Sequence, residues 1–118
     1  MNKGIVSTGS KEATQAGVDV LCAGGNAFDA AIASVFASMT SEFALTGVGG
    51  GGAMMCHVMG NKPILYDFFV DTPPLSDDKD LDFFGIDVDF GDSTQKFHIG
   101  KGSVAVPGTL LGLITVHK

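Results

Sequence analysis

The residue patterns in this chain that could do chemistry are few, and a glycine run is the first of them. The sequence GVGGGG at residues 47–52 matches the GxGxxG spacing of dinucleotide-binding sites. Such a site needs a strand before the glycines and a helix after them, so that the helix N-terminus faces the pyrophosphate. Here a helical pattern precedes the run and a strand pattern follows it. The reversed order argues against dinucleotide binding.

An acidic segment, residues 71–92, is the second candidate, with eight aspartates and one lysine. Residues 78–82 carry aspartates at alternating positions, like the front of a calcium loop, and Asp89 holds the twelfth place. The sixth place is Phe83, where the EF-hand turn requires glycine, and aspartate is short for the bidentate twelfth ligand. A solvated acidic connector is the favoured interpretation. A non-enzymatic module that binds a cation or a basic partner through residues 71–92 stays open as the alternative function.

The histidines and cysteines indicate no further chemical site. His57, His98 and His117 lie far apart, and none has a partner at the spacing of metal ligands. Cys22 and Cys56 lack CxxC spacing, so we expect two buried free thiols that behave as small hydrophobic side chains. We expect neither a metal nor a cofactor, and no Ser-His-Asp constellation can be argued from the pattern.

The composition indicates one domain that belongs to a larger protein. At 118 residues the chain has room for a single domain, residues 1–118. Charged residues make up only 17%, whereas about 25% is usual for a free-standing domain. We therefore expect a fragment with a face that packs against a missing part; a very compact free-standing domain is the alternative.

The charge and hydropathy patterns exclude several partners. The net charge is −6 with no basic patch, so neither nucleic acid nor an anionic membrane surface is an expected partner. The longest apolar stretch, residues 27–39, is shorter than the roughly 20 residues of a membrane span. No signal-peptide hydrophobic region follows Met1. We expect a cytoplasmic protein, or a periplasmic one if a leader has been removed.

The hydrophobic pattern predicts the elements that must position any site. Two helices are expected over residues 11–24 and 27–40, the first capped by Ser10 and the second by Asn26, with Asp29 in a near capping box. A third helix opens at Pro107. The expected strands cover residues 4–8, 53–59, 64–70 and 102–106, of which the middle two form a hairpin. This order predicts an α/β or α+β fold with helices packed on a sheet.

Four segments in order resemble the start of the large subunit of γ-glutamyltransferase, also called γ-glutamyltranspeptidase. They are residues 7–17 (STGSKEATQAG), 24–31 (GGNAFDAA), 46–52 (TGVGGGG) with the hairpin after it, and 102–108 (GSVAVPG). Each motif is weak alone, and together they are specific. The resemblance implies a divergent family member whose N-terminal part lies here. It also implies an N-terminal-nucleophile (Ntn) hydrolase fold, a four-layer αββα sandwich of which this chain forms a part.

The resemblance implies an autoprocessing enzyme of glutathione metabolism. A γ-glutamyl or related acyl group of glutathione-like amides would be transferred or hydrolysed through an acyl-enzyme on the N-terminal Thr of the small subunit. In the family the nucleophile, the oxyanion-hole glycines and the Asp that binds the substrate amine lie in that subunit, beyond Lys118. No catalytic residue is therefore expected in this chain, which should be inactive alone. Its expected partners are the remainder of the large subunit, the small subunit and a small-molecule amide substrate. A family member that has lost catalysis is a further alternative.

One substrate contact of the family should lie in this chain. After the second hairpin strand the family usually carries Arg-Glu-Thr-Ala-Pro, whose Arg pairs with the substrate α-carboxylate. Here the sequence is FFVDTPP at residues 68–74, and Val70 stands at the Arg position. Losing a charge-assisted contact of about 1.5–3 kcal/mol would weaken binding roughly ten- to a hundredfold.

Either another residue supplies the cation, or the substrate lacks that carboxylate, and the apolar run favours a more hydrophobic acyl group. We expect Phe69, Val70, Asp71 and Thr72 to form one wall of the substrate pocket. A strand end packed under the acidic loop is the structural alternative.

Overall fold

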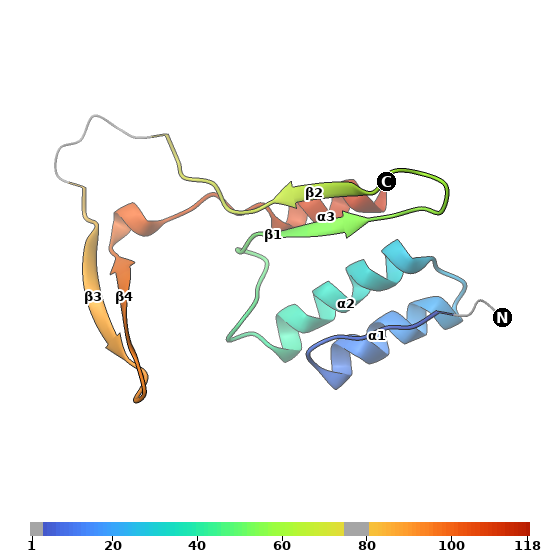
Figure 1. The fold of residues 1–118 in the computed structure, drawn as a ribbon, viewed down its shortest axis with the longest axis horizontal. Coiled ribbons are helices and arrows are strands. Elements are labelled where there is room, and N and C mark those ends of the chain that lie inside the picture. The colour runs from blue at the N-terminus through green and yellow to red at the C-terminus, as the bar shows by residue number, and fades with distance from the viewer. Residues whose placement is uncertain (1–3, 75–80) are drawn as a thin grey trace. The chain divides into compact units, whose positions relative to one another are not determined.

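The computed structural model describes residues 4–74 and 81–118 and divides the chain into two compact units (Figure 1). The first unit holds residues up to Val70 together with Pro107–Lys118, and the second is Asp71–Val106. The prediction of one domain over residues 1–118 stays a prediction. Among the described helices, none has both the length and the apolar character needed to cross a membrane.

The first unit begins with two helices, α1 (Lys11–Cys22) and α2 (Ala27–Ser41). Ser10 caps α1 by accepting a hydrogen bond from the Ala13 N–H at 3.3 Å. Gly17 of α1 is buried against α2, where a Cβ would overlap Ser34 Oγ and lie 3.2 Å from the Ala30 carbonyl oxygen. The absence of a side chain at Gly17 therefore lets the two helices approach closely.

A two-stranded hairpin and a third helix complete the first unit. Strands β1 (Gly52–Cys56) and β2 (Ile64–Phe68) pair antiparallel from Gly52↔Phe68 to Cys56↔Ile64, and the third helix is α3 (Thr109–His117). One core joins α2, α3 and the hairpin. It consists of Ile32, Met39 and Leu113, with Val35, Met54, Phe68 and Val116 packed around them.

The second unit is built on the antiparallel hairpin of β3 (Phe84–Asp89) and β4 (Thr94–Ile99), followed by the short 3-10 helix η1 (Lys101–Ser103). The register pairs Phe84 with Ile99 and Ile86 with Phe97, so apolar side chains share one face of the hairpin. Phe83 stacks on His98 with ring centroids 4.9 Å apart.

The helices and the first hairpin confirm the sequence predictions, with ends that shift by a few residues. Two predicted strands are wrong. Residues 4–8 form no ladder with any described residue, and without a partner strand this short segment is not a strand. Residues 102–106 instead contain the end of η1 and a single bridge from Val106 to Asp71, because Ser103 turns back to donate to the Gly100 carbonyl.

The acidic segment also differs from its prediction as a connector. Part of the segment forms strand β3. The high aspartate content of the segment masks the apolar residues of this strand. Residues 75–80, which include most of the calcium-like stretch, lie outside the described residues. The third helix begins at Thr109, so Pro107 precedes it and Gly108 is its N-cap.

The two cysteines are free, but only Cys56 is buried. The prediction of two buried thiols is wrong for Cys22, which ends α1 with its side chain exposed. Cys22 is the last residue of α1, so no further helical turn follows to cover it.

Candidate substrate wall at the end of β2

The four residues predicted to form a substrate wall follow β2 directly. Phe69 and Val70 are the last residues of the first unit before the chain leaves it, and Asp71 and Thr72 open the second unit. Phe69 is 69% exposed, Val70 is half-buried, and Asp71 and Thr72 are exposed. A large apolar side chain that is so exposed at a strand end is available to contact a ligand or another part of the protein.

Local hydrogen bonds shape this strand end. The Phe69 N–H donates to Asp67 Oδ1 at 3.1 Å, and the Thr72 N–H donates to Asp71 Oδ1 at 2.8 Å. Asp71 and Val106 exchange two backbone hydrogen bonds, at 3.2 and 2.7 Å. Asp67 thus accepts from the N–H two residues on, as in an Asx turn, and the Asp71 side chain accepts from the N–H of its neighbour Thr72.

The backbone on the first-unit side of the wall lies against two glycines. A Cβ on Gly51 would overlap the Val70 nitrogen and lie 2.7 Å from the Phe69 carbonyl carbon. A Cβ on Gly108 would overlap the Phe68 carbonyl oxygen and lie 3.1 Å from the Phe69 carbonyl oxygen. These contacts bring together segments that are far apart in the sequence, namely the glycine run, the end of β2 and the start of α3.

The chain contains lysine but no arginine that could supply a positive charge to this wall. The seven basic residues are all lysines, and the 118 residues contain no arginine. A bidentate guanidinium–carboxylate pair cannot form with any residue of this chain. In the described part of the chain, no group of three or more His, Cys, Asp or Glu side chains is placed to hold a metal ion.

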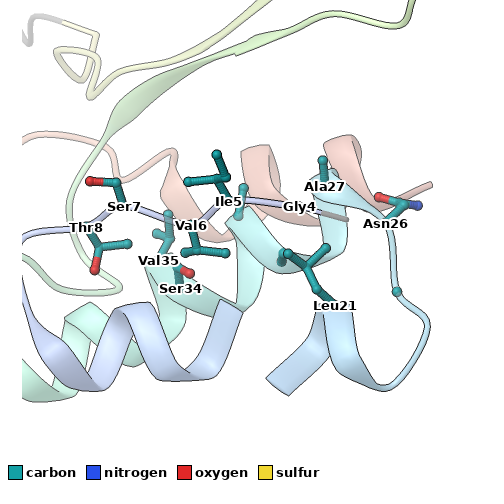
Figure 2. Close-up of a pocket in the computed structure, with 13 residues that line it drawn as sticks. Gly4, Ile5, Val6, Ser7, Thr8, Leu21, Asn26, Ala27, Ser34 and Val35 are labelled. Carbon is teal, nitrogen blue, oxygen red and sulfur yellow. The ribbon is translucent and has the colours of Figure 1, made fainter. Parts of the chain in front are cut away.

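A separate hollow of about 500 Å³ lies in the first unit, between residues 4–8 and the two N-terminal helices (Figure 2). Its lining is mostly apolar, and it contains no acid, base or cation. Ser34 lines it with a buried hydroxyl that has no hydrogen-bond partner among the described residues. Without a titratable group, this hollow is not a second candidate for acid–base chemistry.

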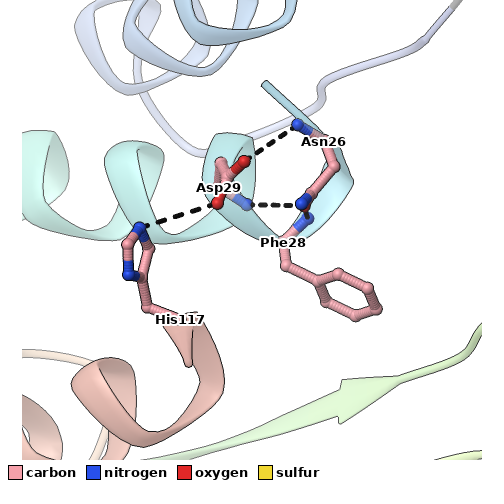
Figure 3. Close-up of polar contacts among 4 residues, drawn as sticks. All are labelled: Asn26, Phe28, Asp29 and His117. Atoms are coloured by element: carbon pink, nitrogen blue, oxygen red, sulfur yellow. Dashed lines mark hydrogen bonds and ion pairs between the residues drawn. The ribbon is translucent and has the colours of Figure 1, made fainter. Parts of the chain in front are cut away.

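Polar contacts join the start of α2 to the end of α3 (Figure 3). Asn26 Oδ1 accepts from the N–H groups of Phe28 (2.7 Å) and Asp29 (3.1 Å), and Asp29 Oδ2 accepts from the Asn26 N–H (3.0 Å). This is a complete capping box, where the sequence predicted a near one. Asp29 Oδ1 also lies 3.7 Å from Nε2 of His117. These contacts cap α2 and link it to α3, so they have a structural role and do not indicate a second functional site.

The family model described as gamma-glutamyltranspeptidase matches residues 13–118. The chain belongs to the gamma-glutamyltranspeptidase family. The family assignment made from the four sequence segments is thereby confirmed.

Individual relatives agree with this assignment. The glutathione hydrolase proenzyme of Bacillus subtilis (strain 168) is 38% identical over 93% of this chain and 18% of its own length. The acylase ACY 1 proenzyme of Pseudomonas sp. (strain V22) is 34% identical over 94% of this chain and 20% of its own length. The chain thus spans about a fifth of the length of these curated relatives.

The structural comparison agrees with the fold prediction. The Bacillus anthracis transpeptidase enzyme CapD matches with a TM-score of 0.74 and 26% identity, over 99% of this chain and 33% of that chain. The mixed helix-and-sheet class is confirmed, and the chain has the fold of part of an Ntn-hydrolase sandwich.

Proposed function

We propose that residues 1–118 are the N-terminal part of the large subunit of a γ-glutamyltransferase-like enzyme. The enzyme would transfer or hydrolyse a γ-glutamyl, or related acyl, group of glutathione-like amides. The match of the gamma-glutamyltranspeptidase family model to residues 13–118 carries this proposal. Relatives named as glutathione hydrolase proenzymes support it, as does the small share of their length that this chain spans.

The chemistry would take place on residues outside these 118. A Thr at the amino terminus of the small subunit would attack the amide carbonyl, with its own α-amine as base, and form an acyl-enzyme. Water or an acceptor amine would then release the acyl group. Residues 1–118 would supply the scaffold and one wall of the donor pocket, formed by Phe69, Val70, Asp71 and Thr72.

The composition of this wall supports a donor other than an ordinary γ-glutamyl amide. Val70 stands where the family usually has Arg, and this chain has no arginine elsewhere to replace it. Phe69 adds an exposed apolar surface beside Val70. A donor acyl group that lacks the α-carboxylate would need no cation there, and the relative named as an acylase supports a wider range of acyl groups in the family.

A matched series of donors tests the proposal with the full-length protein. γ-Glutamyl, γ-aminobutyryl and butyryl p-nitroanilides lose first the α-carboxylate and then the amine while the scissile amide stays the same. We expect self-cleavage of the precursor and a higher kcat/KM for a donor without the carboxylate than for γ-glutamyl p-nitroanilide. Turnover of the γ-glutamyl donor at the level of a standard family enzyme would refute the altered specificity.

The same preparation separates the enzyme from its alternatives. A protein that neither cleaves itself nor releases p-nitroaniline from any donor would contradict the enzymatic proposal and favour a member that has lost catalysis. Calorimetric titration with calcium addresses the acidic segment, because only a cation-binding module predicts heat of binding.

A further inference from the structure

The backbone at the end of β2 is held between two segments that are distant in sequence. Gly51, near the end of the glycine run, lies on one side, and Gly108, which precedes α3, lies on the other. At both positions a Cβ would come within 3.0 Å of backbone atoms of residues 68–70, a separation that real Cβ atoms essentially never show. Backbone atoms cannot swing aside as a side-chain end can, so a methyl group at either glycine must displace the strand end.

The two glycine segments are also bound to each other. The carbonyl oxygen of Gly50 accepts hydrogen bonds from the N–H groups of Gly108 (3.1 Å) and Thr109 (3.2 Å). These donors belong to the N-terminus of α3, which otherwise has no side-chain cap. The glycine run, the strand end and the start of α3 therefore form one junction made of backbone atoms.

Gly49, in the same glycine run, does not share this constraint. A Cβ on Gly49 would meet no atom within 4 Å. Gly49, Gly51 and Gly108 also have no positive φ, so alanine can adopt the backbone conformation at all three positions. Any difference between alanine substitutions at these positions comes from the space that the methyl group occupies.

We propose that Gly51 and Gly108 are positioning residues that set the donor preference of the enzyme by fixing where Phe69 and Val70 lie. The inference rests on the proposed function, in which Phe69 and Val70 face the donor acyl group. Since no side chain lies between the glycines and the backbone of residues 68–70, Phe69 and Val70 cannot shift without disturbing this junction. A misplacement of about 1 Å in a substrate-positioning group can change a rate on the order of a hundredfold.

The test uses the full-length protein with the substitutions Gly51→Ala and Gly108→Ala, and Gly49→Ala as the matched control. The readout is the ratio of kcat/KM for γ-aminobutyryl and γ-glutamyl p-nitroanilides, together with circular dichroism to establish folding. We expect each variant to change this ratio by about tenfold or more, because the wall moves relative to the donor. Gly49→Ala should keep the wild-type ratio.

Each other outcome has a separate meaning. A wild-type protein that is inactive on both donors overturns the proposed function, and this inference with it. An active wild type whose two variants lose both donors in equal proportion overturns the inference alone, because a general loss of structure would do the same. Failure of both variants to fold would likewise make the glycines purely structural and overturn the inference.

Discussion

At the scale of single residues, Val70 is the residue of the proposed wall whose substitution is most informative. It is half-buried at the end of β2, and the chain has no arginine to replace the guanidinium that the family places there. If the proposed wall faces the donor, one substitution at position 70 should supply the contact with the substrate carboxylate that the resemblance implies.

We expect Val70→Arg to raise the preference for γ-glutamyl over γ-aminobutyryl p-nitroanilide roughly ten- to a hundredfold, as a charge-assisted pair of about 1.5–3 kcal/mol would. Val70→Met is the matched control, since it adds length without charge. Paired kcat/KM measurements on the full-length protein check this. An equal response to Arg and Met would show that position 70 does not face the carboxylate.

Asn26 is the residue whose local role can be predicted most fully from sequence. Its side chain accepts two backbone hydrogen bonds at the start of α2. We expect Asn26→Ala to lower the free energy of unfolding by about 1 kcal/mol, and Asn26→Gly by a few tenths. Urea unfolding of the full-length protein measures both.

His117→Gln serves as the control for the capping prediction. It removes the contact with Asp29, but the His117 side chain is 65% exposed and 3.7 Å away, so its effect should be no more than about 0.5 kcal/mol. If Asn26→Ala and His117→Gln lower the free energy of unfolding equally, the cap at Asn26 is not what stabilises the start of α2.

At the scale of elements, the contact between α1 and α2 depends on the absence of a side chain at Gly17. We expect Gly17→Ala to lower the free energy of unfolding by about 1–3 kcal/mol, because its methyl group would overlap Ser34 Oγ. Ser34→Ala alone should be neutral or stabilising, since it removes a buried hydroxyl that has no partner in the described structure.

A double-mutant cycle checks the Gly17 prediction. In the Ser34→Ala background, Gly17→Ala should be less destabilising, though not harmless, because Val6 Cγ1 would still lie 2.9 Å from the new Cβ. Gly47→Ala is the control, as its Cβ would meet nothing within 4 Å. Additive effects of the two substitutions would mean that Ser34 is not the obstacle.

The sequence predicts these elements unevenly, for physical reasons. Caps are local signals, so Ser10 and Asn26 locate the starts of two helices. Strands depend on partners that are often distant in sequence. Residues 4–8 are predicted as a strand but have no partner among the described residues, whereas the strand Phe84–Asp89 is missed because aspartates surround its apolar residues. The wall residues can be placed at a strand end from sequence, but the contact with Gly108 joins distant segments and could not be foreseen.

At the scale of the whole molecule, each unit exposes large apolar side chains. Ile5 (97%), Leu45 (86%) and Leu111 (73%) in the first unit are examples, and Phe90 (60%) is one in the second. Only 17% of the residues are charged, so little polar surface is available to separate them.

We expect residues 1–118 produced alone to self-associate and to bind a hydrophobic dye, because soluble monomers rarely expose large contiguous apolar patches. Light scattering and dye fluorescence measure this, with the full-length protein as the comparison. A monomeric fragment that does not increase the fluorescence of the dye would contradict the prediction. It would mean that the exposed apolar side chains are too scattered to form an interface.

The points where the chain leaves and re-enters the first unit are neighbours, since Gly108 lies against Phe68 and Phe69. Residues 71–106 are therefore an excursion from the first unit that begins after Val70 and ends before Pro107, at two junctions close together in space. Doubling the length of such an excursion adds only about 0.6 kcal/mol of closure entropy. We therefore expect insertions, deletions or grafted peptides within residues 71–106 to leave the three helices of the first unit undisturbed. Because the proposed wall lies at the first of these two junctions, we expect changes there to alter selectivity while the helical scaffold stays the same.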